Sequence, residues 1–260
     1  MFLLGDYEQF FNAEQRQRYG AYQANLETSP PEQIKALVVP HHVVAAGLTA
    51  QAIALLTQLE VKPTAVIVIG PNHSNSEAAA ATTRLGWQTV SGNAEAEQTM
   101  ITALLQQGLI KENDALFQKE HSIAAIIPWI VEYLPGTPVV PIIFHYQYPL
   151  KDLQSIMAVL DPWLQQGAVL VASIDFAHGL ARAPAERNDK VTRAAIQNGD
   201  SKKIAHLDSK YLDAPTLLAA LLDYFADQQQ LPPYILANTN SGDLLQNSQG
   251  EVTSYFTIAF

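Results

Sequence analysis

Four of the seven histidines in this 260-residue chain stand within four residues of the end of an apolar run: His41, His73, His145 and His178. Apolar runs of this length are typical of buried strands. Neutral imidazoles bind divalent metals at about 2.0–2.1 Å, and two of them with one carboxylate leave positions open for a substrate. The sequence therefore predicts a histidine-rich metal pocket, and such a ligand set suits non-haem iron(II).

The remaining chemistry is limited by composition. The chain contains no cysteine, which excludes disulfides, thiolate ligands and a cysteine nucleophile, so only histidines and carboxylates are left as ligands. Lys and Arg number 15 against 25 Asp and Glu, for a formal charge of -10. Nucleic acid is therefore not expected as a partner, because its phosphates would be repelled over most of the surface.

Strands and helices alternate along the sequence. Four strongly apolar runs are expected to be strands that alternate with helical patterns: Ala36–Val39, Ala65–Ile69, Pro138–Phe144 and Ala168–Ile174. We expect an α/β fold with a mixed, mostly parallel central sheet flanked by helices. Two further segments, Tyr234–Ala237 and Val252–Phe260, are expected to add an antiparallel edge. Ligands in such folds bind at the carboxyl ends of the strands.

Other segments complete this pattern. Residues 81–90 suggest a hairpin or edge strand, and residues 123–134 suggest one mostly buried helix despite Pro128. Further helices are expected from about Leu48 to Leu59 and at 93–107, 150–166, 184–198, 200–206 and 213–228.

The whole chain is expected to form a single domain, residues 1–260. Hydrophobic residues make up 48% of it and charged residues 15%, which is a globular composition. Residues 1–34 are expected to be an N-terminal arm packed on this domain. No stretch approaches the roughly 18 apolar residues of a membrane span, and the first residues lack a signal-peptide pattern. We therefore expect a cytoplasmic protein with no membrane partner.

Several short motifs, taken together in their order and spacing, resemble the Memo-like family, whose bacterial and archaeal members are named AmmeMemoRadiSam system protein B. The resemblance covers about Leu37 to Phe260. It rests on Pro40-His41, Gly70-Pro71-Asn72-His73, Glu120-His121-Ser122, Asp175-Phe176-Ala177-His178-Gly179 and Asn240-Ser241-Gly242-Asp243.

The resemblance implies a fold like that of class III extradiol dioxygenases. By the same likeness His41 and His73 match metal-ligand histidines, and His178 matches an acid or base. His121 and Asp175 match polar positions that line the pocket. Animal members carry a cysteine near the C-terminal turn as a third ligand, and Asp243 is the candidate to replace it here.

Each of these assignments has a structural alternative. Asp175 either forms an acid/base pair with His178 or only caps the following segment. His121 either lines the pocket or only begins a helix after Glu120. Asp243 is either a ligand or part of an ordinary turn.

The other three histidines receive no such role. His145 is an extra residue at a strand end, with no family motif around it. His42 is expected to point away from its neighbour His41, and both His42 and His206 are expected on the surface.

Three functions follow. The first is a pocket that binds a divalent metal, iron above all, or a small polar ligand, with oxidative chemistry as a possibility and an unknown substrate. The second is a non-haem iron(II) extradiol-type dioxygenase, with His41, His73 and a carboxylate around the iron and His178 moving a proton. The third is a non-catalytic protein that binds a peptide or partner. Radical-SAM partners are suggested by the family's name alone.

Overall fold

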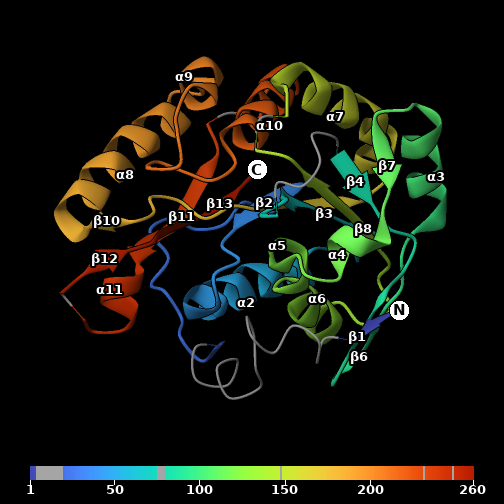
Figure 1. Ribbon diagram of the computed structural model, residues 1–260, viewed down its shortest axis with the longest axis horizontal. Helices are drawn as coiled ribbons and strands as arrows, with labels where there is room; N and C mark the ends of the chain where they lie inside the picture. Colours follow the sequence, from blue (N-terminus) through green and yellow to red (C-terminus); the bar gives the residue numbers. More distant parts are fainter. Residues whose placement is uncertain (4–19, 75–79, 147, 231, 248) are drawn as a thin grey trace.

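A mixed sheet of eight strands runs through the middle of the protein (Figure 1). The computed structural model describes residues 1–3, 20–74, 80–146, 148–230, 232–247 and 249–260. In order across the sheet, the strands are β11 (Tyr234–Asn240), β13 (Ser254–Ala259), β2 (Ala36–Val39), β9 (Val169–Ser173), β3 (Val66–Pro71), β8 (Val139–Phe144), β4 (Ala80–Thr82) and β7 (Ile110–Glu112).

The centre of this sheet is parallel. β9 lies between β2 and β3 and pairs in parallel with both, and β8 pairs in parallel with β3. All four strands are buried on both faces, which explains why each of them is a continuous apolar run rather than an alternating one. The expected mixed, mostly parallel sheet is confirmed.

Antiparallel strands lie toward both edges. β11 and β13 pair with each other and β13 pairs with β2, as the sequence predicted for the terminal segments. At the other side β4 runs antiparallel to β8 and parallel to β7. Two small sheets lie outside: β1 (Phe2–Leu3) with β5 (Trp87–Thr89) and β6 (Gly92–Ala94), and β10 (Leu180–Ala181) with β12 (Glu251–Val252).

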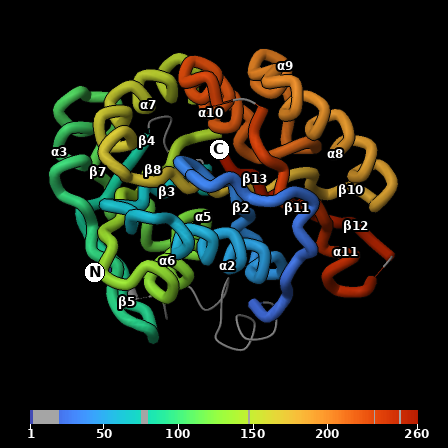
Figure 2. Tube along the Cα trace, turned by 180° about the vertical axis from the view of Figure 1, so that it is seen from behind, coloured from blue at the N-terminus to red at the C-terminus, as the bar shows by residue number. Residues whose placement is uncertain are grey.

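Helices cover both faces of the sheet, as the opposite views in Figures 1 and 2 show. One face carries α3 (Gln98–Gln106), α7 (Leu150–Gln165), α8 (Arg182–Gln197), α9 (Ser201–Ala205) and α10 (Pro215–Asp227). The other carries α2 (Ala46–Leu55) and α6 (Ile127–Tyr133). The short elements are η2 (Val43–Ala45), η3 (Leu56–Gln58), α4 (Asp114–Phe117), α5 (His121–Ala124) and α11 (Ser241–Leu244). None of the helices in the described ranges is both long and apolar enough to cross a membrane.

Two expected helices differ from those observed. The single helix predicted over residues 123–134 is divided into α5 and α6, because Pro128 stands in the first turn of α6 and cannot continue an earlier helix. The helix predicted from Asn93 starts only at Gln98, because residues 92–94 pair with β5 as strand β6. Both errors arise where strand pairing or a proline overrides local propensity.

The expected N-terminal arm falls partly outside the described residues, which omit 4–19. Within 20–34 the chain runs beside the free edge of β11, where the Glu27 N–H donates to the Leu236 carbonyl at 2.7 Å. The Gln51 side chain also holds this segment, since it makes two hydrogen bonds to the backbone of Ala24. These contacts cover a strand edge that would otherwise be open to pairing.

The parallel centre should dominate stability. Ile67 is fully buried in β3 between β8 and β9, and truncation of its side chain leaves a cavity in the hydrophobic core. We expect Ile67→Ala to lower the free energy of unfolding in urea by about 2–5 kcal/mol. Val61→Ala, at a residue 73% exposed, should change it by less than about 0.5 kcal/mol. Equal effects of the two changes would contradict this account of the core.

Candidate metal centre

A cluster of histidines and carboxylates, called the pocket below, forms where three neighbouring parallel strands end. His41 follows β2, His73 follows β3, and Asp175 follows β9, the strand that lies between them. Since parallel strands deliver their carboxyl ends to one edge of the sheet, these residues meet although up to 134 positions separate them in the chain.

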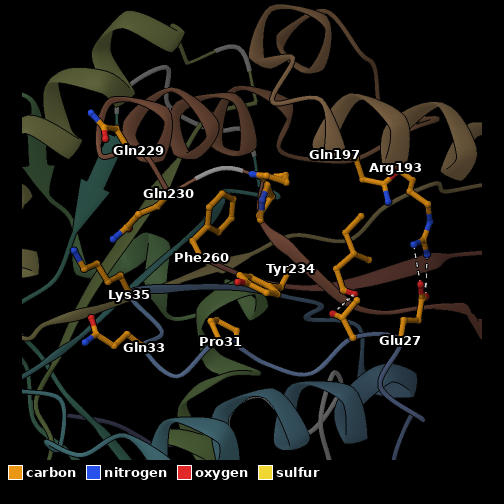
Figure 3. A pocket seen from close by; sticks show the side chains of 14 residues that line it. Glu27, Pro31, Gln33, Lys35, Arg193, Gln197, Gln229, Gln230, Tyr234 and Phe260 are labelled. Carbon is orange, nitrogen blue, oxygen red and sulfur yellow. Dashed lines mark hydrogen bonds and ion pairs between the residues drawn. The ribbon is translucent and has the colours of Figure 1, made fainter.

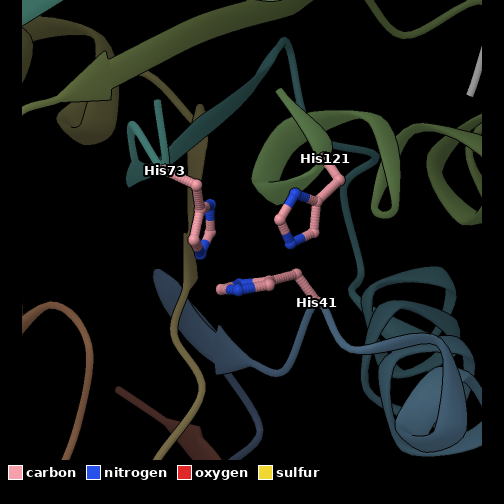
Figure 4. Close-up of side chains that lie close together, drawn as sticks. All are labelled: His41, His73 and His121. Atoms are coloured by element: carbon pink, nitrogen blue, oxygen red, sulfur yellow. The ribbon is translucent and has the colours of Figure 1, made fainter. Parts of the chain in front are cut away.

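Three imidazoles meet at this edge (Figure 4). The ring centroids of His41 and His73 are 4.9 Å apart, and those of His73 and His121 are 4.2 Å apart. One ring nitrogen from each of the three lies within 4.8 Å of the others. His121, the first residue of α5, therefore lines the pocket as well as starting a helix.

Hydrogen bonds fix the tautomer of His41. Its Nδ1 lies 3.0 Å from the Ser173 hydroxyl, and that hydroxyl donates its single proton to the Ser122 carbonyl at 2.6 Å. Ser173 can therefore only accept from His41, so Nδ1 carries the proton and Nε2 presents a lone pair.

Glu120 fixes the tautomer of His73 in the same way. Its carboxylate accepts from His73 Nδ1 at 2.8 Å and from the His73 N–H at 2.7 Å. The same carboxylate accepts the Ser122 N–H at 2.7 Å and so caps α5. With Nδ1 donating to a carboxylate, the free lone pair of His73 is again on Nε2. Burial alone would raise the pKa of Glu120, but the hydrogen bond and charge of His73 bring the pKa below its ordinary value.

Gly70 makes room for Ser122 and Ser173 to approach the end of β3. A Cβ at this position would lie 2.9 Å from the Ser122 Oγ and 3.1 Å from the Ser173 Cβ. Only glycine leaves room for both serines against the end of β3, which gives a physical reason for glycine in the Gly70-Pro71-Asn72-His73 motif.

Asp213 is a pocket residue that the sequence did not reveal. Its Oδ2 lies 3.3 Å from His41 Nε2 and 4.0 Å from His73 Nε2. Neither of its carboxylate oxygens has a hydrogen-bond partner within the described part of the chain. It follows no apolar run, and its place just before Pro215, the first residue of α10, is typical of a helix cap. Sequence reasoning therefore had no signal that pointed to it.

Asp175 and His178 share the loop after β9. One Asp175 oxygen accepts the His41 N–H at 3.1 Å, and the other lies 3.5 Å from His41 Nε2. With His41 and Asp213 it forms a second group of ligand atoms within 4.8 Å of one another. His178 is half-buried, and its Nδ1 has no hydrogen-bond partner among the described residues.

Burial favours the neutral form of three imidazoles, those of His41, His121 and His178. It is the main cause that lowers the pKa of His41 well below its ordinary value, and the nearby His73 and His121 add to the effect. It also lowers the pKa of His121 to about 4 and that of His178, although the charge of Asp175 opposes the shift at His178. For Asp213, burial and the neighbouring Asp175 raise the pKa well above its usual range. Neutral imidazoles are the form that binds a metal or accepts a proton.

Other sequence candidates lie elsewhere. Asp243 forms an ion pair with Arg182 at 2.6 Å and belongs to neither group of ligand atoms found among the described residues. The ring of His145 packs on Tyr146, with centroids 4.6 Å apart. His42 is half-buried and its Nδ1 lies 2.6 Å from the Tyr255 hydroxyl, so its assignment to the surface was wrong. His206 is exposed, as predicted.

A separate cavity of about 650 Å³ lies at the opposite ends of the strands, where Lys35 precedes β2 and Tyr234 begins β11 (Figure 3). Its Arg193 is already neutralised by Glu27, with two contacts of 2.8 and 2.9 Å. It contains none of the clustered histidines and carboxylates, so the candidate centre is the edge near His41.

Comparison with known proteins identifies the family. The family described as "Memo-like protein" matches residues 9–253. This chain belongs to the Memo-like family. A MEMO1 family protein of Caldivirga maquilingensis is 27% identical over 243 residues, which cover 88% of this chain and 84% of that protein.

Two further relatives carry the same name. One from Methanopyrus kandleri is 26% identical over 212 residues, which cover 76% of this chain and 72% of that protein. One from Pyrobaculum aerophilum is 27% identical over 154 residues, or 58% of this chain and only 55% of that protein. The match therefore spans about half the length of the Pyrobaculum relative.

The fold is similar to that of a solved structure. An uncharacterized protein of Escherichia coli K12 matches 86% of this Memo-like chain and 99% of its own, with a TM-score of 0.50 and 13% identity. At this identity the likeness concerns the fold alone. It agrees with the α/β architecture described above.

The low pKa of His121 should make stability fall in acid. Between the ordinary value of 6.5 and about 4, the unfolded chain binds a proton that folded His121 does not, so the free energy of unfolding decreases as pH falls through this window. Between pH 7 and pH 5 this contribution amounts to about 2 kcal/mol. In urea unfolding, the free energy of unfolding of His121→Gln should decrease less between pH 7 and pH 5 than that of the parent protein. The difference between the two decreases should be about 2 kcal/mol. Identical decreases in both proteins would rule out a buried neutral His121.

Proposed function

We propose that this protein binds one divalent metal ion through His41, His73 and Asp213. The observation that carries the proposal is a convergence of lone pairs. The Nε2 atoms of both histidines and an Asp213 oxygen face one another, and the hydrogen bonds made by the Nδ1 atoms leave both Nε2 lone pairs free. An ionised Asp213 would repel these lone pairs, so the arrangement requires either a proton on Asp213 or a cation at its centre.

The distances fit an ion at this position. Ligand atoms bound to one metal at about 2.0–2.2 Å lie roughly 3 to 3.6 Å apart. The contact from His41 Nε2 to Asp213 is 3.3 Å, and that from His73 Nε2, at 4.0 Å, needs only a small closure. His121 and Asp175 stand next to this set and are available as further ligands.

The donor set favours iron(II). Two histidines and one carboxylate are the ligands of non-haem iron(II) sites, and the chain offers no thiolate that would select copper(I). Asp213 takes the place that the sequence assigned to Asp243, because Asp213 reaches both histidines and Asp243 is paired with Arg182. When bound, the metal would supply a Lewis acid and a redox centre.

The residues around the ligands would handle protons. His178, neutral because it is buried, can accept a proton from a hydroxyl of a small polar ligand, and Asp175 stabilises the imidazolium that results. His121, 25% exposed, stands where it can contact the same ligand. We assign His178 as the acid or base. Asp175 would stabilise its imidazolium form, and His121 would contact the ligand in the pocket.

Metal analysis tests this assignment. Protein loaded with iron(II) under anaerobic conditions should hold about one ion per chain. His41→Ala, His73→Ala and Asp213→Ala should each weaken binding by at least roughly 10- to 100-fold, as measured by elemental analysis after dialysis against graded chelator. Asp243→Ala, a matched carboxylate outside the centre, should bind like the parent protein.

The opposite pattern is equally informative. Loss of metal in Asp243→Ala with retention in Asp213→Ala would reverse the choice of carboxylate. Negligible metal in the parent protein and in all variants would contradict the metal function and favour the reading as a peptide- or partner-binding protein.

A dioxygenase of the extradiol type is the second candidate. It is favoured by one observation: His178, whose pKa is lowered by burial, accompanies the proposed ligands His41, His73 and Asp213. Anaerobic iron loading followed by a catechol-cleavage assay tests it. Ring opening that is lost in His178→Ala, while that variant keeps its iron, would support it; bound iron without turnover would leave only the metal-binding function.

A further inference from the structure

We propose that Asp189, a buried carboxylate outside the pocket, is a positioning residue that holds Asp213 and His178 in place through Ser254. Asp189 lies on α8, and Ser254 is the first residue of β13. The inference rests on the proposed function in one respect, the role of Asp213 as a metal ligand.

Ser254 holds the loop after β9 through three hydrogen bonds. Its carbonyl accepts the Phe176 N–H at 2.9 Å, and its own N–H donates to the Ala177 carbonyl at 2.9 Å. Its hydroxyl oxygen accepts the Ala177 N–H, also at 2.9 Å. Asp175 and His178 flank Phe176 and Ala177, the two residues that Ser254 binds. Ser254 therefore sets the position of both Asp175 and His178.

Asp189 fixes the hydroxyl of Ser254. This hydroxyl donates its single proton to an Asp189 oxygen at 2.6 Å, a short contact of the kind that charged acceptors make. With its proton committed to Asp189, the oxygen keeps its lone pair toward Ala177. Without Asp189 the hydroxyl could rotate and the Ala177 N–H could lose its acceptor.

The same loop places Asp213. Phe176 forms an isolated antiparallel bridge with Leu212, and the Asp213 N–H donates to the Asp175 carbonyl at 3.0 Å. The loop is thus held by Ser254 on one side and carries residues 212–213 on the other. A continuous chain of hydrogen bonds and strand contacts leads from Asp189 to the proposed third ligand.

Asp189 has little else to explain its burial. It is only 7% exposed, and its second oxygen accepts a long hydrogen bond of 3.3 Å from Asn238. It makes no ion pair within the described part of the chain, and the nearby Arg193 pairs with Glu27 instead. Burial raises the pKa of Asp189, so this environment disfavours the charge. Ser254 is its closest partner.

Amide hydrogen exchange of the metal-free protein tests the positioning role directly. In Asp189→Ala the amides of Ala177 and Asp213 should exchange roughly tenfold faster than in the parent protein, while amides in β3 and β8 stay protected. Asp189→Asn keeps an acceptor for the Ser254 hydroxyl and should restore near-parental exchange. Ser254→Ala should reproduce the Asp189→Ala pattern, and it provides the test if Asp189→Ala does not fold.

A matched control separates positioning from general destabilisation. Thr192→Val changes another fully buried polar residue of α8, whose hydroxyl bonds within the helix. It should leave the relative exchange at Ala177 and Asp213 unchanged even if it lowers stability. Equal exchange in the parent protein, Asp189→Ala and Ser254→Ala would overturn the proposal.

A double-mutant cycle then tests the link to the metal, with cobalt(II) as the probe. Asp189→Ala should weaken cobalt binding about tenfold in the parent background and have no further effect in Asp213→Ala, because the ligand that it positions is already absent. The same loss in both backgrounds would overturn the link to Asp213. If the parent protein binds no cobalt or iron, the proposed function fails, and the exchange measurements still decide whether Asp189 positions the loop.

Discussion

The parallel pairing of β9 with β2 on one side and β3 on the other is the constraint on which the pocket depends. It brings the ends of three strands to one edge, where His41, His73 and Asp175 leave the sheet together. The strands can hold these ends rigidly because both faces of the sheet are buried under helices, so that the backbone has little freedom to shift.

Buried hydrogen bonds then decide how the imidazoles point. Ser173 and Glu120 occupy the Nδ1 atoms of His41 and His73, which turns both Nε2 lone pairs toward the same space. The pattern is the one seen around metal-binding histidines, where an outer acceptor fixes the tautomer and the orientation of the ring. Asp213 differs from His41 and His73 in that no hydrogen bond orients its side chain: its buried oxygens have no hydrogen-bond donor among the described residues. The cation that we propose would give the Asp213 carboxylate a partner.

Burial also changes the pKa values of the residues in the pocket of this Memo-like protein. Burial lowers the pKa of three of its histidines and raises that of Asp213, which favours neutral imidazoles and a protonated carboxylate. Metal binding would displace that proton. Outside the pocket, the contacts of Ser254 extend the organised region to α8 and explain how a loop between distant segments can be held in one conformation.

The sequence by itself determined the four central strands and some of the residues in the pocket. Buried parallel strands must be continuous apolar runs, so the strands at the centre of the sheet could be predicted, and with them the histidines that end them. Asp213 could not be predicted, because it follows no strand and enters the pocket only through its contact with the Asp175 loop. His145 satisfied the same rule as His41 and yet lies at the end of β8, one strand further from β9, with its ring against Tyr146. The order of strands across a sheet is set by long-range pairing, which no local pattern of residues encodes, and that order decided which polar groups became neighbours.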